Sequence, residues 1–189
     1  MISIIIYLSI AIVLMIMVKL FFDACSLIYI TKINLKEHLP ALGKIYVSQS
    51  VKEELISDLE RFDDAKVLNE NINHKLINIR NFKRTNRFSN RNLGLGEKDT
   101  IELCLKEDGV LVTDDHKALN LALGIGLKPK TSEIILLDFL KNSIISYENF
   151  KNSFWELARI KTLNPEIIAF LFDKAKEMIK PRNQNKGEK

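Results

Sequence analysis

The sequence predicts an α/β protein with three layers, α/β/α, in which a central, mostly parallel sheet lies between two layers of helices. Short apolar runs at 19–22, 44–47 and 109–112 have the length of buried strands. Longer segments with apolar residues at helical spacing follow these runs. Strands that alternate with helices are typical of a parallel sheet, because a helix usually makes the crossover between two parallel strands.

The first half of the chain is expected to contain two strand–helix pairs. The first strand ends at Asp23, where the chain turns into a helix that continues to about residue 30. A second strand at 44–47 precedes a helix from about residue 51, and Ser50 with Glu53 has the spacing of a capping box at its start. The apolar stripe of this helix is Val51, Leu55, Leu59 and Phe62.

The middle of the chain is expected to complete the sheet. Residues 76–82 are compatible with a further strand, and 93–108 with a glycine-containing turn and a helix. The inward residues of that helix are expected to be Ile101, Cys104 and Leu105. The strand at 109–112 then leads into a helix at 116–123 that ends at a glycine.

Three more helices are expected to close the domain at 132–142, 146–160 and 164–180. The last of them should begin with Asn164 as its N-cap and Pro165 as its first residue. Trp155 is expected in the core between these helices.

Size and composition favour one compact domain, at 19–180. The chain has 189 residues, 47% of them apolar, which is enough for a proper core. Its 28 Lys and Arg against 24 Asp and Glu give a net charge of +4, which only hints at an anionic partner. Two cysteines without a CxxC motif argue against a disulfide scaffold or a zinc knuckle, and fit a reducing compartment.

Both ends of the chain differ from this domain. Residues 1–18 are apolar and uncharged, with a marginal length for spanning a bilayer and no clear signal-peptide features. Two interpretations stay open: a membrane anchor, or a wrongly assigned start with Met17 as the true one. The expected location is therefore cytoplasmic, or membrane-anchored through 1–18 with a cytoplasmic domain. The tail at 181–189 is expected to be disordered.

Five acidic residues are candidates for a metal site: Asp23, Glu54, Asp99, Asp114 and Asp115. Asp23 and the adjacent pair Asp114 and Asp115 follow strands, so they should lie at the carboxyl edge of the sheet, where ligands of such folds bind. Glu54 and Asp99 lie in first turns of helices that can face the same edge. Carboxylates gathered in one cleft repel, and a hard cation such as Mg²⁺ or Mn²⁺ relieves that repulsion. Such an ion can activate water for displacement at phosphorus.

Each of these acids also has a purely structural interpretation. Asp23 could cap the following helix, Glu54 could be solvated, and Asp99 could favour a helix N-terminus, with Glu97 competing for its role. One member of the pair 114–115 is expected to cap the helix at 116–123, which leaves the other as a ligand.

A basic stretch at 80–91 is the candidate for nucleic-acid binding. It contains no acid, and Phe82 and Phe88 are interleaved with its cations. Cations can neutralise phosphates and aromatic rings can stack on unpaired bases, although a solvated loop would have the same composition. The cations are Arg80, Lys83, Arg84, Arg87 and Arg91.

Four stretches together resemble the PIN domain, a metal-dependent nuclease fold found in many prokaryotic toxin–antitoxin toxins. They are "FFDACSLI" (21–28), "VSQSVKEEL" (47–55), "GEKDTIELC" (96–104) and "LVTDDHKALNLALGIGL" (111–127). The chain is most similar to the subgroup with a Gly-Glu-x-acid-x-Ile pattern and a double aspartate after the last core strand. The resemblance covers roughly residues 19–180.

The resemblance implies specific roles for the candidate acids. Asp23 matches the aspartate of the first strand, Glu54 the helix glutamate and Asp99 the third acid, and Thr113 with Asp114 and Asp115 matches the closing element. Mg²⁺ or Mn²⁺ would be held by Asp23, Asp99 and one of the adjacent aspartates, and Glu54 would ligate the ion or orient water.

The resemblance also implies an activity and partners. We expect an endoribonuclease that cleaves single-stranded RNA and acts as the toxin of a toxin–antitoxin pair, with a small antitoxin as partner and a possible homodimer. The alternative is a catalytically degenerate PIN domain that acts as an RNA-binding or interaction module. A receiver-like signalling domain would need a phosphorylatable aspartate and a later lysine, each after a strand, and no convincing pair is present.

Overall fold

A computed structural model describes residues 18–57, 66, 68, 70–72, 74, 76–85 and 87–179. The described chain forms two compact units, the first ending at Ser132 and the second beginning at Glu133. The apolar segment at 1–17 and the tail lie outside the described residues, so the expectations for them stay predictions. None of the helices in the described part of the chain combines the length and the apolar character that a bilayer span requires.

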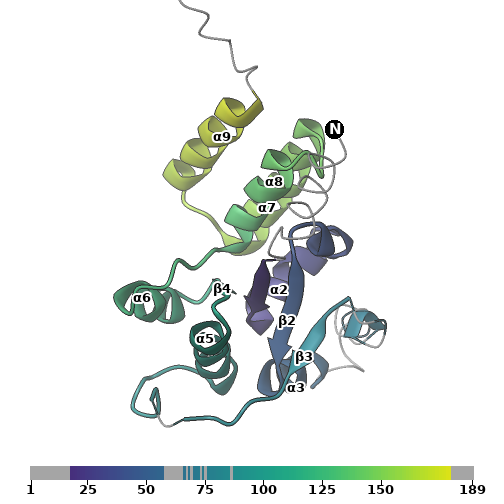
Figure 1. Cartoon of the computed structure of the whole chain (residues 1–189). Helices are drawn as coiled ribbons and strands as arrows, with labels where there is room; N and C mark the ends of the chain where they lie inside the picture. Colours follow the sequence, from purple (N-terminus) through teal and green to yellow (C-terminus); the bar gives the residue numbers. More distant parts are fainter. Residues whose placement is uncertain are drawn as a thin grey trace, which may run out of the picture. The chain divides into compact units, whose positions relative to one another are not determined.

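The first unit is built on a sheet whose four described strands are all parallel (Figure 1). The strands are β1 (Lys19–Phe22), β2 (Lys44–Ser48), β3 (Asn78–Arg80) and β4 (Val110–Val112), and their order in the sheet is β3-β2-β1-β4. The chain therefore builds the sheet in one direction from β1 to β3, and then returns to the other side of β1 with β4. This arrangement confirms the predicted parallel α/β fold.

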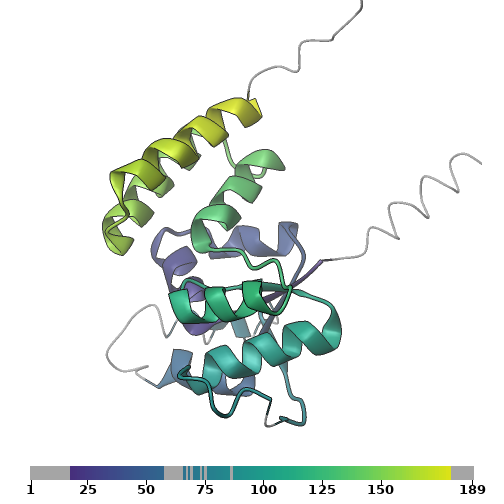
Figure 2. The ribbon, with the colours of Figure 1, turned by 90° about the vertical axis from the view of Figure 1, so that its left-hand side faces the viewer.

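Helices flank the sheet on both sides. They are α2 (Ala24–Lys32), the 3₁₀ helix η1 (Lys36–Ala41), α3 (Gln49–Ile56), α5 (Leu95–Glu107) and α6 (His116–Gly124). All of them except α6 lie in the connections between the strands of the sheet. In Figure 2, α5 and α6 lie in front of the strands. The result is the three-layer α/β/α architecture that the sequence predicts.

The alternation of side chains along the strands divides the core into two faces. Phe21 of β1 lies opposite Tyr46 of β2 and Leu111 of β4, and its ring stacks on Tyr46 with centroids 5.3 Å apart. These three residues pack with the inner faces of α5 and α6, including Ile101 and Cys104. The neighbours of Phe21 along β1 point to the other face and are also buried. A strand that is buried on both faces is typical of a parallel sheet.

The start of α3 differs from the predicted capping box. The side chain of Ser48, not Ser50, caps this helix by accepting a hydrogen bond from the Val51 amide at 3.1 Å. The helix begins two residues earlier than expected because β2 runs directly into it, which frees the Ser50 hydroxyl for another partner. Val51 and Leu55 are buried as predicted, whereas Leu59 and Phe62 of the predicted stripe lie outside the described residues.

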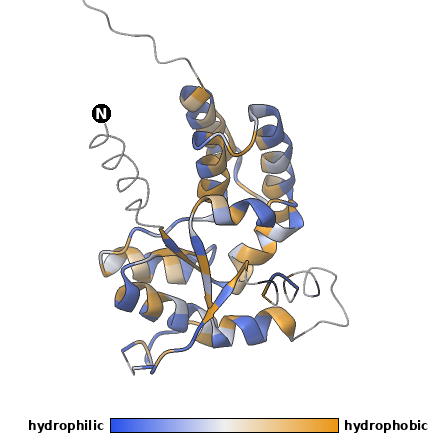
Figure 3. Ribbon diagram, turned by 45° about the vertical axis from the view of Figure 1, so that its right-hand side comes forward, coloured by the Kyte–Doolittle hydropathy of each residue, from blue (hydrophilic) through white to orange (hydrophobic). Residues whose placement is uncertain are grey.

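The second unit consists of the helical segments α7 (Ser132–Lys141), α8 (Tyr147–Lys161) and α9 (Pro165–Ile179). Asn164 caps α9 as predicted, because its side-chain oxygen accepts a hydrogen bond from the Glu166 amide at 2.8 Å. Figure 3 shows that hydrophobic and hydrophilic residues mix along these helices. Phe150 and Phe154 are buried, but Trp155 is 56% exposed, so its predicted place in the core is wrong. Trp155 follows the buried Phe154 directly, and consecutive residues of a helix point about 100° apart.

Candidate functional site

The strand order creates a topological switch point between β1 and β4. From β1 the chain continues to β2 on one side, and β4 joins β1 on the other side. The connections on the two sides of such a point leave in opposite directions, which opens a crevice at the carboxyl ends of the strands. Asp23 follows β1 directly, and Thr113, Asp114 and Asp115 follow β4 directly. The sheet therefore places the acids that end these two strands at the edge where ligands bind.

Asp23 is buried at this edge and held in place from two sides. One carboxylate oxygen accepts a hydrogen bond from the Ser26 amide at 2.8 Å, which caps α2, and the other accepts a hydrogen bond from the Thr113 hydroxyl. The side chain is only 2% exposed. Burial raises the pKa of Asp23 to about 6, the two hydrogen bonds oppose this shift, and the nearby charge of Asp114 adds to it.

The adjacent aspartates have different contacts. Asp115 is the N-cap of α6, since its carboxylate accepts a hydrogen bond from the Ala118 amide at 2.8 Å. The Asp114 carboxylate instead accepts a hydrogen bond from the Ser132 amide at 3.1 Å and lies close enough to Asp23 to affect its charge. This confirms the prediction that one member of the pair caps the helix.

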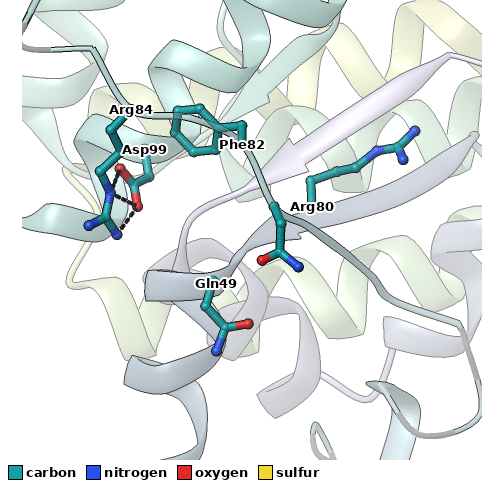
Figure 4. A pocket seen from close by; sticks show the side chains of 6 residues that line it. Gln49, Arg80, Phe82, Arg84 and Asp99 are labelled. Atoms are coloured by element: carbon teal, nitrogen blue, oxygen red, sulfur yellow. Dashed lines mark hydrogen bonds and ion pairs between the residues drawn. The ribbon is translucent and has the colours of Figure 1, made fainter.

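Asp99 is a second buried carboxylate, and it is fully engaged by protein groups. Its side chain is reached by the Ser50 hydroxyl at 2.5 Å and by Arg84, which donates from Nε at 2.7 Å and from Nη2 at 2.7 Å (Figure 4). The Ser50 hydroxyl also lies 2.9 Å from the hydroxyl of Ser48 at the carboxyl end of β2. Because β2 pairs with β1, this chain of hydroxyls leads from Asp99 to the strand end beside Asp23.

Glu54 and Glu97 form a further acidic pair beside the start of α5. The Glu54 carboxylate accepts a hydrogen bond from the Gly96 amide at 3.2 Å. A Cβ atom at Gly96 would lie 2.7 Å from that carboxylate, so only glycine permits the contact without a shift. Burial raises the pKa of Glu54, and the charges of Glu97 and then Asp99 raise it further. One oxygen of Glu97 is buried without a hydrogen-bond partner among the described residues.

The donor set fits a hard divalent cation in its chemistry, but its arrangement does not enclose one. Carboxylate oxygens are the ligands that Mg²⁺ and Mn²⁺ favour. Burial raises the pKa of Asp23 and of Glu54, and neighbouring carboxylates add to both shifts. Within the described ranges, however, no group of three or more His, Cys, Asp or Glu side chains is placed to hold a metal ion. The Arg84 guanidinium on Asp99 and the capping role of Asp115 occupy two of the predicted ligands.

The basic stretch at 80–91 is only partly available to a nucleic acid. Arg80 stacks over Tyr46 at 4.7 Å from the ring centroid and pairs with Glu107 at 3.3 Å, and Arg84 is bound to Asp99. The remaining predicted cations, Lys83, Arg87 and Arg91, are exposed.

The two aromatic residues of this stretch differ in exposure. Phe88 is 5% exposed and belongs to the core, so it is not a base-stacking residue as its spacing suggested. Phe82 is partly buried and lies beneath the Lys106 ammonium, 4.8 Å from its ring centroid.

Two residues of the candidate site were not recognised from the sequence. Ser50 was interpreted as a helix cap but contacts Asp99, and Gln49 lines a cavity together with Phe82, Arg84 and Asp99. Their positions at the end of β2 gave one usable signal, because the carboxyl ends of parallel strands share one edge.

The comparison with known sequences agrees with this geometry. No curated protein matches the chain. The sequence model of a family described as "PIN domain" matches residues 16–177, which is most of the chain and includes the acidic residues above. The chain therefore belongs to the PIN-domain family.

Proposed function

We propose that the chain is a metal-dependent endoribonuclease that cleaves single-stranded RNA. The observation that carries the proposal is the Asp23 carboxylate, which is buried at the switch point near Asp114. The pKa of Asp23 is raised to about 6. Burying a charge without a cationic partner is costly, and such groups cluster at functional sites. PIN-family membership supports a nuclease, and the RNA substrate follows from the resemblance of the motifs.

In this proposal Asp23, Asp99 and Asp114 would hold Mg²⁺ or Mn²⁺ once the ion displaces Arg84 from Asp99, and Glu54 would orient water. When bound, the ion supplies Lewis acidity, which favours deprotonation of water and stabilises charge at phosphorus. Thr113 and Ser26 fix the orientation of the Asp23 carboxylate, and Ser50 fixes that of Asp99. Asp115 holds the start of α6 and is left out of the ligand set.

The toxin role is proposed on the resemblance of the motifs to those of toxin–antitoxin toxins. A small antitoxin as partner, and a homodimer, belong to the same proposal. Growth arrest of a bacterial host on expression of the wild type, and its relief by Asp23→Asn, would support the toxin role. Normal growth at equal expression of the wild type would contradict it.

The alternative is a degenerate PIN domain that binds RNA or another protein without cleavage. The observation that favours it is the Arg84 guanidinium, which neutralises Asp99 as a metal ion would. The two functions differ in their need for metal. A nuclease requires the ion to cleave RNA, whereas a binding module with Arg84 on Asp99 would bind RNA without it.

An RNA cleavage assay decides between them. The full chain is incubated with a labelled single-stranded RNA in Mn²⁺, and parallel reactions contain EDTA or the Asp23→Asn variant. We expect cleavage only by the wild type in Mn²⁺. Asp138→Asn on α7 is a control with the same charge change in the second unit. Equal cleavage by Asp23→Asn and wild type would contradict the assignment of the site.

A further inference from the structure

A cavity of about 310 Å³ lies in the first unit beside Asp99. Its lining comes from three elements: the first residue of α3, the end of β3 with the segment that follows it, and α5. Its volume is at the lower end of the roughly 300–1,000 Å³ that ligand sites span. The lining residues are Gln49, Arg80, Asn81, Phe82, Arg84 and Asp99 (Figure 4).

The wall that carries Phe82 is held firmly in place. The Lys106 ammonium lies over the Phe82 ring and donates a hydrogen bond to the Lys83 carbonyl at 2.5 Å. The Thr85 amide donates to the Glu102 carboxylate at 2.8 Å, and Lys106 pairs with Glu102 at 2.9 Å. Lys106 covers the ring, Phe82 also packs against the core, and the part of Phe82 that lines the cavity is the surface that a planar ligand can contact. The segment after β3 is thus a preorganised wall, although it has no regular secondary structure.

The lining has the composition that a nucleotide requires. An aromatic ring stacks on any base, two carboxamides offer donors and acceptors for base edges, and a guanidinium attracts a phosphate. The amide nitrogen of Gln49 donates to Glu53 at 3.0 Å, which leaves its oxygen as an acceptor for an amino group of a base. In Figure 4 the Arg80 guanidinium is directed away from Arg84 and Asp99, so Arg84 is the cation of the lining that lies beside Asp99.

We propose that this cavity binds one unpaired nucleobase of the RNA next to the scissile phosphate, with Phe82 as the stacking platform and Gln49 and Asn81 as the residues that read the base edge. The cavity reaches Asp99, which belongs to the proposed metal site, so a base bound here places its own phosphate near the reacting edge of the sheet. The inference rests on the proposed function, since it assumes an RNA strand at that edge. The cavity would make the protein prefer some bases over others, and the metal site alone gives no such preference.

Binding without cleavage is the direct test. The affinities of the full chain for oligo(A), oligo(C) and oligo(U) of equal length, and for an abasic strand, are measured by fluorescence anisotropy in EDTA. We expect Phe82→Leu to weaken binding of all three base-containing strands about fivefold or more, and to change binding of the abasic strand by less than about twofold. We expect Gln49→Ala and Asn81→Ala to reduce the preference for oligo(A) and oligo(C) over oligo(U) by about threefold or more.

Matched variants control for surface and folding effects. Phe170→Leu and Asn152→Ala remove the same groups from exposed positions of the second unit, and should leave every affinity unchanged. Phe82→Tyr retains the ring and should retain the dependence on bases, even if the melting temperature of Phe82→Leu falls. An equal loss for the abasic and base-containing strands, or unchanged ratios in Gln49→Ala and Asn81→Ala, would overturn the inference.

A cleavage assay in Mn²⁺ separates this inference from the proposed function. If the wild type cleaves RNA but the variants leave the affinity ratios between the three oligonucleotides unchanged, the base pocket is overturned and the proposed nuclease activity is not. If the variants change these affinity ratios but the wild type does not cleave RNA, the base pocket is supported and the proposed nuclease activity is overturned.

Discussion

Asp23 and Asp99 are equally buried, at 2% exposure each, but their carboxylates have different hydrogen-bond partners. Asp99 accepts hydrogen bonds from a guanidinium and a hydroxyl, which together balance its charge. Asp23 accepts hydrogen bonds only from an amide and a hydroxyl in the contacts described, and a second carboxylate lies nearby. Asp23 is therefore poised between its protonated and ionised forms near a pH of about 6, which is its raised pKa.

The raised pKa of Asp23 predicts how stability depends on pH in the absence of metal. Between about pH 4 and about pH 6 the folded state retains this proton and the unfolded state has released it. The free energy of unfolding should therefore fall as pH rises through this window, by about 3 kcal/mol at 1.36 kcal/mol per pKa unit, and then level off.

Asp23→Asn should remove this fall, because asparagine caps α2 nearly as well and does not ionise. In EDTA we expect the variant to be more stable than the wild type at pH 7.5 or so, and similar to it near pH 4. Chemical denaturation at a series of pH values measures both. Parallel profiles for the two proteins would contradict the assigned pKa.

Arg84 predicts an effect on metal affinity. Arg84→Ala should lower the free energy of unfolding in EDTA by about 1 kcal/mol, because the buried Asp99 loses a charge-assisted partner. The same change should tighten Mn²⁺ binding about two- to fivefold, since the ion no longer competes with a half-exposed guanidinium. Isothermal titration with Mn²⁺ in the absence of RNA measures this affinity. Arg87→Ala is the control, and weaker Mn²⁺ binding by Arg84→Ala would contradict a competing role.

At the scale of elements, the strand ends serve two purposes at once. The helices α2, α3 and α6 begin within four residues of a strand end, and Asp23, Ser48 and Asp115 cap them. Each cap satisfies a free amide of a helix N-terminus, and it also sets the direction in which the neighbouring side chains leave the sheet. Helix starts and site residues are therefore coupled at this edge.

This coupling predicts different outcomes for the adjacent aspartates. Asp114→Asn should abolish metal-dependent cleavage with little loss of stability, because asparagine is a poor ligand for Mg²⁺ but still accepts the Ser132 hydrogen bond. Asp115→Asn should remain active, because asparagine caps α6 as well as aspartate does. Asp115→Ala should lose about 1 kcal/mol of stability. Cleavage rates and thermal unfolding are the two readouts, and an inactive but stable Asp115→Asn would reverse the assignment.

At the scale of the whole molecule, charge is distributed more unevenly than the net value of +4 suggests. Acidic groups gather at the carboxyl edge of the sheet, and exposed cations follow β3 along 83–91. A nuclease needs both, one to hold a cation and one to attract phosphates. The PIN family match covers both compact units, so the second unit belongs to the family pattern although the acidic edge lies in the first.

The location of the cations predicts the salt dependence of RNA binding. Replacing Lys83, Arg87 and Arg91 by Ala should reduce the slope of log affinity against log salt by about 2, at about 0.7 per phosphate contact on a single strand. Replacing Arg159, Lys174 and Lys176 of the second unit changes net charge equally and should leave the slope unchanged. Anisotropy titrations at four salt concentrations measure it. Equal slopes for the two triple variants would assign RNA binding to net charge alone.

The sequence by itself determined the order of strands and helices along the chain, and which acids follow the strands. These features are local: the length of an apolar run, the helical spacing after it and the residue at its end can be read without knowing any partner. Asp23 after β1, and a cap within the pair 114–115, were correctly predicted for this reason.

Only the tertiary structure decided which groups meet. Ser50 finds Asp99 across 49 residues of sequence, and Arg84 takes the same carboxylate from a segment without regular structure. Phe88 is buried and Trp155 exposed, against expectation, because burial depends on the element that packs opposite and not on the side chain itself. Spacing along a chain predicts which way a side chain leaves its own helix or strand, whereas its partner is chosen by the fold.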